Sequence, residues 1–189
     1  LDIIICINKI DIDVNDSWRE ICEIYSSAGF DVIPISAAEG RGIDEVRQKL
    51  RNKISVLAGP SGVGKSSLLN AVEPNMRARV GEISRKIERG RHTTRQSELL
   101  ELEENTYIVD SPGFTSLDMT GINPDELELY FREFAPYLND CKYNGCKHIN
   151  EDSRFCGVKS QIGKNISESR YLRYKDIYNE IVEERKRLK

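Results

Sequence analysis

The sequence lacks the features that mark a membrane or exported protein. No apolar run approaches the ~20 residues that a transmembrane helix needs, and the first residues do not have the basic, apolar and small-residue layout of a signal peptide. The net charge of the 189 residues is only −3, which argues against generic electrostatic binding to nucleic acid. We therefore expect a cytoplasmic protein without membrane contact, and its 39% apolar content is enough for a hydrophobic core.

An initiating Met is also absent, because the chain opens on LDIIICI at residues 1–7, which resembles a core strand already under way. We therefore expect further residues upstream. Basic side chains gather at residues 84–95 and 183–189, so contacts with an acidic partner remain open despite the low net charge. We expect the protein to be a monomer.

A glycine-rich stretch at residues 57–69, LAGPSGVGKSSLL, is the feature around which the chain is organised. It contains the pattern G-x-x-x-x-G-K-[ST], whose fixed positions are Gly59, Gly64, Lys65 and Ser66. Consecutive backbone N–H groups of such a loop close around phosphate oxygens. The apolar run at residues 54–58 predicts a buried parallel strand before it, and residues 66–71 predict a helix whose N-terminal dipole faces the anion. Lys65 would neutralise the β- and γ-phosphates, and the Ser66 hydroxyl would bind Mg²⁺.

A second polar motif, Asn8-Lys9-Ile10-Asp11, follows the first predicted strand, where ligands bind in open parallel α/β sheets. Asp11 can accept hydrogen bonds from both the N1–H and N2–H groups of guanine, a pairing that adenine does not offer. Asn8 would brace the loop, and Lys9 would lay its stem along the base. Ser36 and Ala37 follow the next predicted strand, where the Ala37 N–H would approach the guanine O6 atom.

Beyond the phosphate loop, residues 80–95 form a long polar segment that is typical of a functional loop. Near the end of this segment, the hydroxyl of Thr93 or Thr94 would reach Mg²⁺ when a γ-phosphate is present. We assign this role to Thr94. Residues 97–102 and 106–109 then predict an antiparallel strand pair that runs into Asp110-Ser111-Pro112-Gly113. Asp110 would hold a magnesium-bound water, and the Gly113 N–H would bind the γ-phosphate.

These motifs together resemble the guanine-nucleotide domain of the translation-factor-like GTPases, but their order is rotated. The base-reading motifs precede the phosphate loop, whereas ordinary members have them last. The tail of one GTPase fused to the head of another would need a second N-K-x-D downstream, and none occurs. Circular permutation is the simpler interpretation. The full sheet of this family has six strands, of which we count about five, so the missing strand would lie upstream of Leu1.

The nucleotide contacts expected from these motifs form one set. It comprises Asn8, Lys9, Ile10, Asp11, Ser36, Ala37, Gly59, Pro60, Ser61, Gly62, Val63, Gly64, Lys65, Ser66, Ser67 and Gly113. The expected Mg²⁺ residues are Ser66, Thr94 and Asp110.

The last third of the sequence contains a candidate metal site, made of Cys141, Cys146, His148 and Cys156. Three thiolates and one imidazole are a usual shell of a closed structural Zn²⁺ site. Cytosolic thiols stay reduced, so closely spaced cysteines favour metal over disulfides, while incidental buried cysteines remain the alternative. Helices are predicted at residues 124–134 and 167–188, the second with an aromatic stripe that favours packing. We predict an α/β P-loop NTPase domain at residues 1–120 and a small α-helical zinc-binding domain at residues 121–189.

Nearly the whole chain resembles the small-subunit-dependent GTPases of the RsgA (YjeQ/YloQ) family. The most specific stretches are GPSGVGKSSLLN at residues 59–70, GRHTT at 90–94, DSPGF at 110–114 and the cysteine spacing. The resemblance implies a circularly permuted GTPase that hydrolyses GTP to GDP with Mg²⁺ and carries one structural Zn²⁺. It further implies stimulation by the small ribosomal subunit and its rRNA, a role in late maturation of that subunit, and an N-terminal OB-fold that this sequence does not contain.

The expected catalysis departs from that of GTPases in which a Gln after the D-x-x-G glycine orients the attacking water. Phe114 occupies that position here, and an apolar side chain cannot polarise water. We expect slow intrinsic turnover, with His92 as the candidate catalytic residue, to which the family resemblance also points. Two alternatives stay open: a P-loop nucleotide kinase of the guanylate kinase type, and a non-catalytic RNA-binding zinc module.

Overall fold

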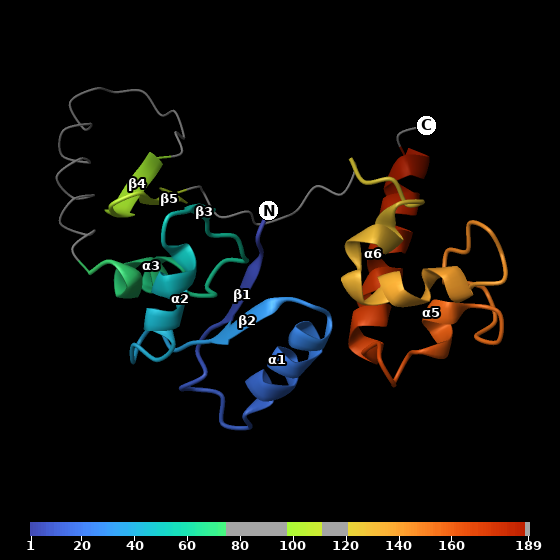
Figure 1. The fold of residues 1–189 in the computed structure, drawn as a ribbon, viewed down its shortest axis with the longest axis horizontal. Helices are drawn as coiled ribbons and strands as arrows, with labels where there is room; N and C mark the ends of the chain where they lie inside the picture. Colours follow the sequence, from blue (N-terminus) through green and yellow to red (C-terminus); the bar gives the residue numbers. More distant parts are fainter. Residues whose placement is uncertain (75–97, 111–120, 188–189) are drawn as a thin grey trace. The chain divides into compact units, whose positions relative to one another are not determined.

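The computed structural model describes residues 1–74, 98–110 and 121–187 (Figure 1). The chain forms two compact units, each considered by itself. We call residues 5–19 and 32–117 the P-loop unit, and residues 1–4, 20–31 and 118–189 the cysteine unit. Residues 20–31, which the sequence suggests for the first domain, thus cluster with the cysteine unit. The domain boundary at residues 120 and 121 stays a prediction.

Helices and strands alternate through the first half of the chain, as expected for an α/β protein. In chain order the elements are β1 (Ile4–Ile7), α1 (Ser17–Ser27), β2 (Asp31–Pro34), α2 (Ile43–Leu50), β3 (Ile54–Val56), α3 (Lys65–Val72), β4 (Glu98–Glu103), β5 (Thr106–Asp110), the 3₁₀ helices η1 (Leu127–Tyr130) and η2 (Arg132–Asp140), α5 (Gly157–Ser160) and α6 (Glu168–Arg187). Among the described residues, no helix is both long and apolar enough to cross a membrane.

The described strands form two sheets, β1-β2 and β3-β5-β4. Strand β3 runs parallel to β5, and β4 pairs antiparallel with β5, as the sequence predicts for both segments. The prediction that β3 is buried is wrong, because Ile54 and Val56 are 70% and 53% exposed. The reason is that, within the described part of the chain, β3 pairs along one edge only, so its side chains lack a second neighbouring strand.

The helix that follows the phosphate loop packs against α2 and is held at its C-terminal end. Its apolar residues Leu68 and Val72 are buried in the P-loop unit, and α2 packs against α3. Arg47 of α2 donates to the carbonyl oxygens of Val72 and Ala71 at 2.9 and 2.8 Å. These carbonyls have no partners within the helix, and a cation beside them also favours the helix dipole. The contact therefore anchors α3, whose N-terminus carries Lys65.

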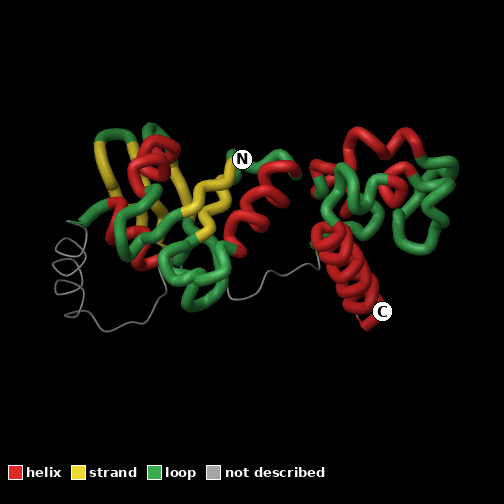
Figure 2. Tube along the Cα trace, turned by 90° about the horizontal axis from the view of Figure 1, so that it is seen from below, coloured by secondary structure: helices red, strands yellow, loops and turns green. Residues whose placement is uncertain are grey.

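The cysteine unit has a core of its own, in which aromatic rings from α6 and the neighbouring 3₁₀ helices pack together. Figure 2 shows α6 as the long helix that runs to the C-terminus. Tyr174 is fully buried, and its ring lies 5.0 Å from that of Phe134, which confirms packing as the role of the aromatic stripe. The single α-helix predicted at residues 124–134 is wrong: η1 ends and η2 begins on either side of Phe131, which has non-helical dihedrals. The Phe131 ring packs against the rings of Phe134 and Tyr174 in the core, so tertiary packing overrides the local helical pattern here.

Candidate nucleotide site and metal centre

Three motifs that are far apart in the sequence meet at the side chain of Asn8. Its Nδ2 atom donates to the carbonyl oxygen of Val63 in the phosphate loop at 2.9 Å. Its Oδ1 atom accepts from the backbone N–H groups of Lys9 at 2.8 Å and Ala37 at 3.1 Å. One amide thus fixes the N-K-x-D turn, the S-A segment and the phosphate loop relative to each other. The P-loop unit therefore brings the predicted base-reading and phosphate-binding segments to one place.

Gly64 is required at this junction for two reasons. Its φ angle of 98° lies in the left-handed region, where an L side chain is strained. In addition, a Cβ atom at this position would collide with the Asn8 Nδ2 atom. The second glycine of the pattern thus serves the turn into α3 and also leaves room for the side chain that links the motifs.

Two lysines, one in the N-K-x-D motif and one at the end of the phosphate loop, donate hydrogen bonds to carbonyl oxygens of that loop. Lys9 Nζ donates to the Gly62 carbonyl oxygen at 2.7 Å. Lys65 Nζ donates to the carbonyl oxygens of Gly59 and Pro60 at 2.7 and 2.8 Å, and so spans the loop from its helical end. An ammonium group held over backbone carbonyls keeps positive charge at the mouth of the loop, where phosphate oxygens would compete for it.

The surroundings of Asp11, the predicted base-reading carboxylate, favour its ionised form. A hydrogen bond from the Ser36 hydroxyl lowers the pKa of Asp11. Ser36 is fully buried, and its Oγ atom also accepts from the Glu39 N–H at 3.1 Å. Because Asp11 stays ionised near neutral pH, its oxygens act as acceptors only, which is the state that pairing with two N–H donors of guanine requires.

The structure describes some of the other predicted nucleotide and Mg²⁺ residues but not all of them. Ser66 and Ser67 lie in the first turn of α3 and are exposed, and a hollow of about 350 Å³ lined by Ala37 and Ser67 adjoins them. Asp110 is the last residue of β5. His92, Thr94 and Gly113 lie outside the described residues.

Cys141, Cys146, His148 and Cys156 come together in the cysteine unit, with their ligand atoms all within 4.8 Å of one another. The His148 Nδ1 atom lies 3.7, 3.4 and 3.2 Å from the sulfur atoms of Cys141, Cys146 and Cys156. A tetrahedral Zn²⁺ with bonds of ~2.3 Å to sulfur and ~2.0–2.1 Å to nitrogen puts these atoms about 3.5 Å apart. The four side chains therefore fit one Zn²⁺ ion.

The chemistry of the thiols agrees with a cation at this position. Burial raises the pKa of both Cys146 and Cys156. A thiolate in such surroundings needs a compensating positive charge, which a divalent metal supplies when it binds.

A carboxylate that sequence reasoning missed orients the histidine ligand. The Glu128 Oε2 atom lies 2.8 Å from Nε2 of His148, whose ring is 1% exposed. A proton held on Nε2 by this contact leaves the Nδ1 lone pair facing the three sulfur atoms, the arrangement common in zinc sites. Glu128 lies on η1, 20 residues before His148 in the sequence, so no local spacing pattern reveals the contact.

The backbone around His148 is held by several further contacts. His148 has a φ angle of 57°, which is uncommon for a residue other than glycine. Glu151 accepts from the N–H groups of Lys147 and Ile149, each at 2.9 Å. Burial disfavours the charge of Glu151, but these backbone hydrogen bonds outweigh it and lower its pKa. The Tyr171 hydroxyl donates to the His148 carbonyl oxygen at 2.7 Å. The ligand loop is thus held in place by side chains from its own turn and from α6.

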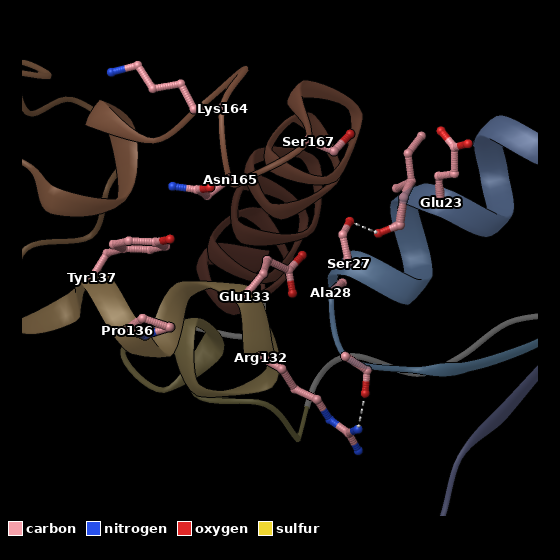
Figure 3. A pocket seen from close by; sticks show the side chains of 12 residues that line it. Glu23, Ser27, Ala28, Arg132, Glu133, Pro136, Tyr137, Lys164, Asn165 and Ser167 are labelled. Carbon is pink, nitrogen blue, oxygen red and sulfur yellow. Dashed lines mark hydrogen bonds between the residues drawn. The ribbon is translucent and has the colours of Figure 1, made fainter.

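The cysteine unit also contains an open cavity of about 660 Å³ (Figure 3). Its wall includes Glu133 and Arg132, and Arg132 donates to the Gly29 carbonyl oxygen at 3.1 Å. None of the predicted nucleotide or metal residues line it. This cavity is larger than the hollow beside the phosphate loop, so size alone does not identify the candidate site.

Comparisons with known proteins were consistent with one family. The family model described as RsgA GTPase matches residues 1–120. A relative from Caldanaerobacter subterraneus subsp. tengcongensis, named small ribosomal subunit biogenesis GTPase RsgA, is 40% identical over 185 residues. The alignment covers 97% of this chain and 62% of that relative. The chain therefore spans less than two thirds of the relative's length.

Two solved structures are also similar. YjeQ from Thermotoga maritima has a TM-score of 0.79 and 38% identity, with 96% of this chain and 60% of that chain covered. YloQ, described as a circularly permuted GTPase, has a TM-score of 0.74 and 31% identity, with 96% and 57% covered. Both similarities extend across the two units of the chain.

Proposed function

The chain belongs to the RsgA GTPase family, and from this premise we propose that it binds GTP with Mg²⁺ and hydrolyses it to GDP and phosphate. Its fold is that of a circularly permuted P-loop GTPase. The observation that carries the proposal is the Asn8 side chain, which links the phosphate loop to the base-reading segments. A phosphate loop alone fits many nucleotides, whereas this linkage sets a fixed distance between phosphate and base recognition.

We assign the reaction to the residues predicted from the sequence. Lys65 and the loop N–H groups hold the phosphates, and Asp11 selects guanine through its two acceptor oxygens. Ser66, Thr94 and Asp110 serve the Mg²⁺ ion, which supplies charge neutralisation at the phosphates when bound. His92 is the proposed catalytic residue, because Phe114 cannot orient water.

We further propose that the small ribosomal subunit and its rRNA are the partner, and that hydrolysis acts late in the maturation of that subunit. The names of the relatives support this assignment. The protein would act in the cytoplasm as a monomer, with one structural Zn²⁺ on Cys141, Cys146, His148 and Cys156. Zinc would stabilise the cysteine unit and take no part in hydrolysis, because all four positions around it are filled by protein ligands.

Product analysis separates this proposal from a kinase. A GTPase releases phosphate from GTP in water, whereas an enzyme of the guanylate kinase type needs GMP as acceptor. The full chain is incubated with radiolabelled GTP, with and without GMP, and the products are separated by thin-layer chromatography. We expect GDP and free phosphate at a rate that GMP does not increase. Label transferred to GMP would contradict the proposal.

A further inference from the structure

Two loops beside the candidate metal ligands carry aromatic and cationic side chains, all exposed except Phe155, which is half-buried. We call Lys142, Tyr143, Arg154 and Phe155 the aromatic platform. Tyr143 is 50% exposed, and its ring lies 6.1 Å from that of Phe155 in an edge-to-face arrangement. An exposed tyrosine of this kind offers an apolar face to a ligand at low cost in side-chain entropy.

Cations surround the two rings. The Lys142 Nζ atom lies 4.5 Å from the ring centroid of Phe155 and 5.7 Å from that of Tyr143. The Arg154 guanidinium lies 5.6 Å from the Phe155 ring and is oriented by Asp152, which accepts from it at 3.0 and 2.9 Å. The platform therefore combines ring faces with positive charge, although Asp152 offsets part of the charge of Arg154.

The platform is held by the metal-binding loops themselves. The Lys142 N–H donates to the Phe155 carbonyl oxygen at 2.9 Å and joins the two loops. Cys141 and Cys156 directly adjoin these residues in the sequence, so a metal on the cysteine cluster fixes both sides of the platform. Rigid aromatic groups lose little freedom when a ligand binds.

A small polar hollow opens next to Tyr143. Its volume is about 200 Å³, and it belongs to the metal cluster, because Cys141, Cys146, His148 and Glu128 line it. Asn139 and Asn144 lie in the same wall, beside Tyr143. Carboxamide groups both donate and accept hydrogen bonds, so they match the mixed donor and acceptor edge of a nucleobase. An acidic peptide would use the cations alone and would leave the ring face and the amides without a matching group.

We propose that the aromatic platform binds an unpaired nucleobase of RNA, which stacks on Tyr143 while Lys142 contacts the phosphate backbone. Single-stranded RNA is commonly recognised in this way, by stacking on aromatic side chains flanked by positive charge. RNA is the expected partner because of the proposed function, on which this inference rests for its choice of ligand.

Binding of a fluorescently labelled single-stranded oligouridylate to the zinc-loaded full chain tests the inference, measured by anisotropy at one fixed salt concentration. Tyr143→Ala is expected to weaken binding about 5- to 150-fold, which corresponds to the ~1–3 kcal/mol for loss of one stacked base. Tyr143→Phe keeps the ring and should bind like the unchanged protein. Tyr130→Ala, which removes a 59% exposed tyrosine on η1, is the matched control and should have no effect. Zinc content verifies that each variant is folded around its metal.

Unchanged binding by Tyr143→Ala, or an equal loss in Tyr130→Ala, would overturn the inference. So would a Tyr143→Ala defect on intact small ribosomal subunits that is absent on naked rRNA, since the platform would then contact a ribosomal protein. The proposed function has a separate readout: if small subunits fail to stimulate GTP hydrolysis while RNA binding still depends on Tyr143, the proposed function fails and the RNA site stands.

Discussion

Glu128 provides the sharpest test of the metal centre, because it contacts a ligand without being one. Its carboxylate lies 2.8 Å from His148 Nε2, and the two side chains are 24% and 1% exposed. In Glu128→Ala, His148 loses the acceptor that keeps Nδ1 directed at the sulfur atoms. The buried Nε2–H group is also left without that partner, which costs free energy.

The size of the effect follows from the kind of contact. Loss of such a partner of a metal-bound histidine lowers metal affinity by about 10- to 100-fold, or ~1.4–2.7 kcal/mol. Glu128→Gln retains an oxygen acceptor but no charge, and neutral hydrogen bonds are roughly half as strong as charge-assisted ones. We therefore expect Glu128→Gln to lie between the unchanged protein and Glu128→Ala.

Zinc affinity is measured by competition with a chromogenic chelator, and the absorption spectrum of the Co²⁺-substituted protein reports whether four ligands remain. Glu126→Ala is the matched control, because Glu126 is an exposed glutamate two residues earlier in the same segment. A zinc dissociation constant for Glu128→Ala that equals that of Glu126→Ala would refute the role assigned to Glu128.

Three further changes test other parts of the structure. Gly64→Ala should weaken GDP binding, measured by calorimetry, at least about tenfold more than the control Gly40→Ala. Gly40 has a similar φ of 78° but open space at its Cβ position, whereas a Cβ at Gly64 displaces Asn8. Equal effects of the two changes would contradict the close approach of Asn8 to Gly64. Glu133→Ala should lower the free energy of unfolding by about 3–5 kcal/mol in denaturant titrations, since the Arg170 side chain, only 13% exposed, loses the carboxylate that lies 2.7 Å away. Asp176→Ala, which removes an exposed ion pair to Arg173, should cost less than about 0.5 kcal/mol, and similar costs for both would show that the Glu133 pair is not special. His92→Ala should retain GTP binding but lose stimulated hydrolysis, and unchanged stimulated turnover would exclude His92 from catalysis.

The nucleotide motifs were predictable because each one is local. The loop at residues 57–69 has its glycines, lysine and serine at fixed spacing, and the same holds for Asn8–Asp11. Their rotated order predicted the permutation. The contact between Asn8 and Val63 spans 55 residues, however, and no spacing rule states which side chain closes such a gap.

Other features depend on tertiary contacts that the sequence does not encode locally. The run at residues 54–58 has the composition of a buried strand, but burial of β3 depends on which strands lie beside it. The cluster of three cysteines and His148 was predicted from cysteine chemistry, whereas Glu128, Glu151 and Tyr171 contact it from distant or ordinary polar positions. The helical pattern at residues 124–134 was misleading because the chain is interrupted at Phe131, whose packing against Tyr174 is not visible in local spacing.

We propose that the permuted motifs form a guanine-nucleotide site at which GTP hydrolysis depends on the small ribosomal subunit. Phosphate release from GTP by the full chain, with and without purified small ribosomal subunits, tests it most directly. We expect slow release alone, acceleration by about tenfold or more with small subunits, and no comparable release from ATP. Equal rates with and without small subunits, or equal rates for GTP and ATP, would contradict the account.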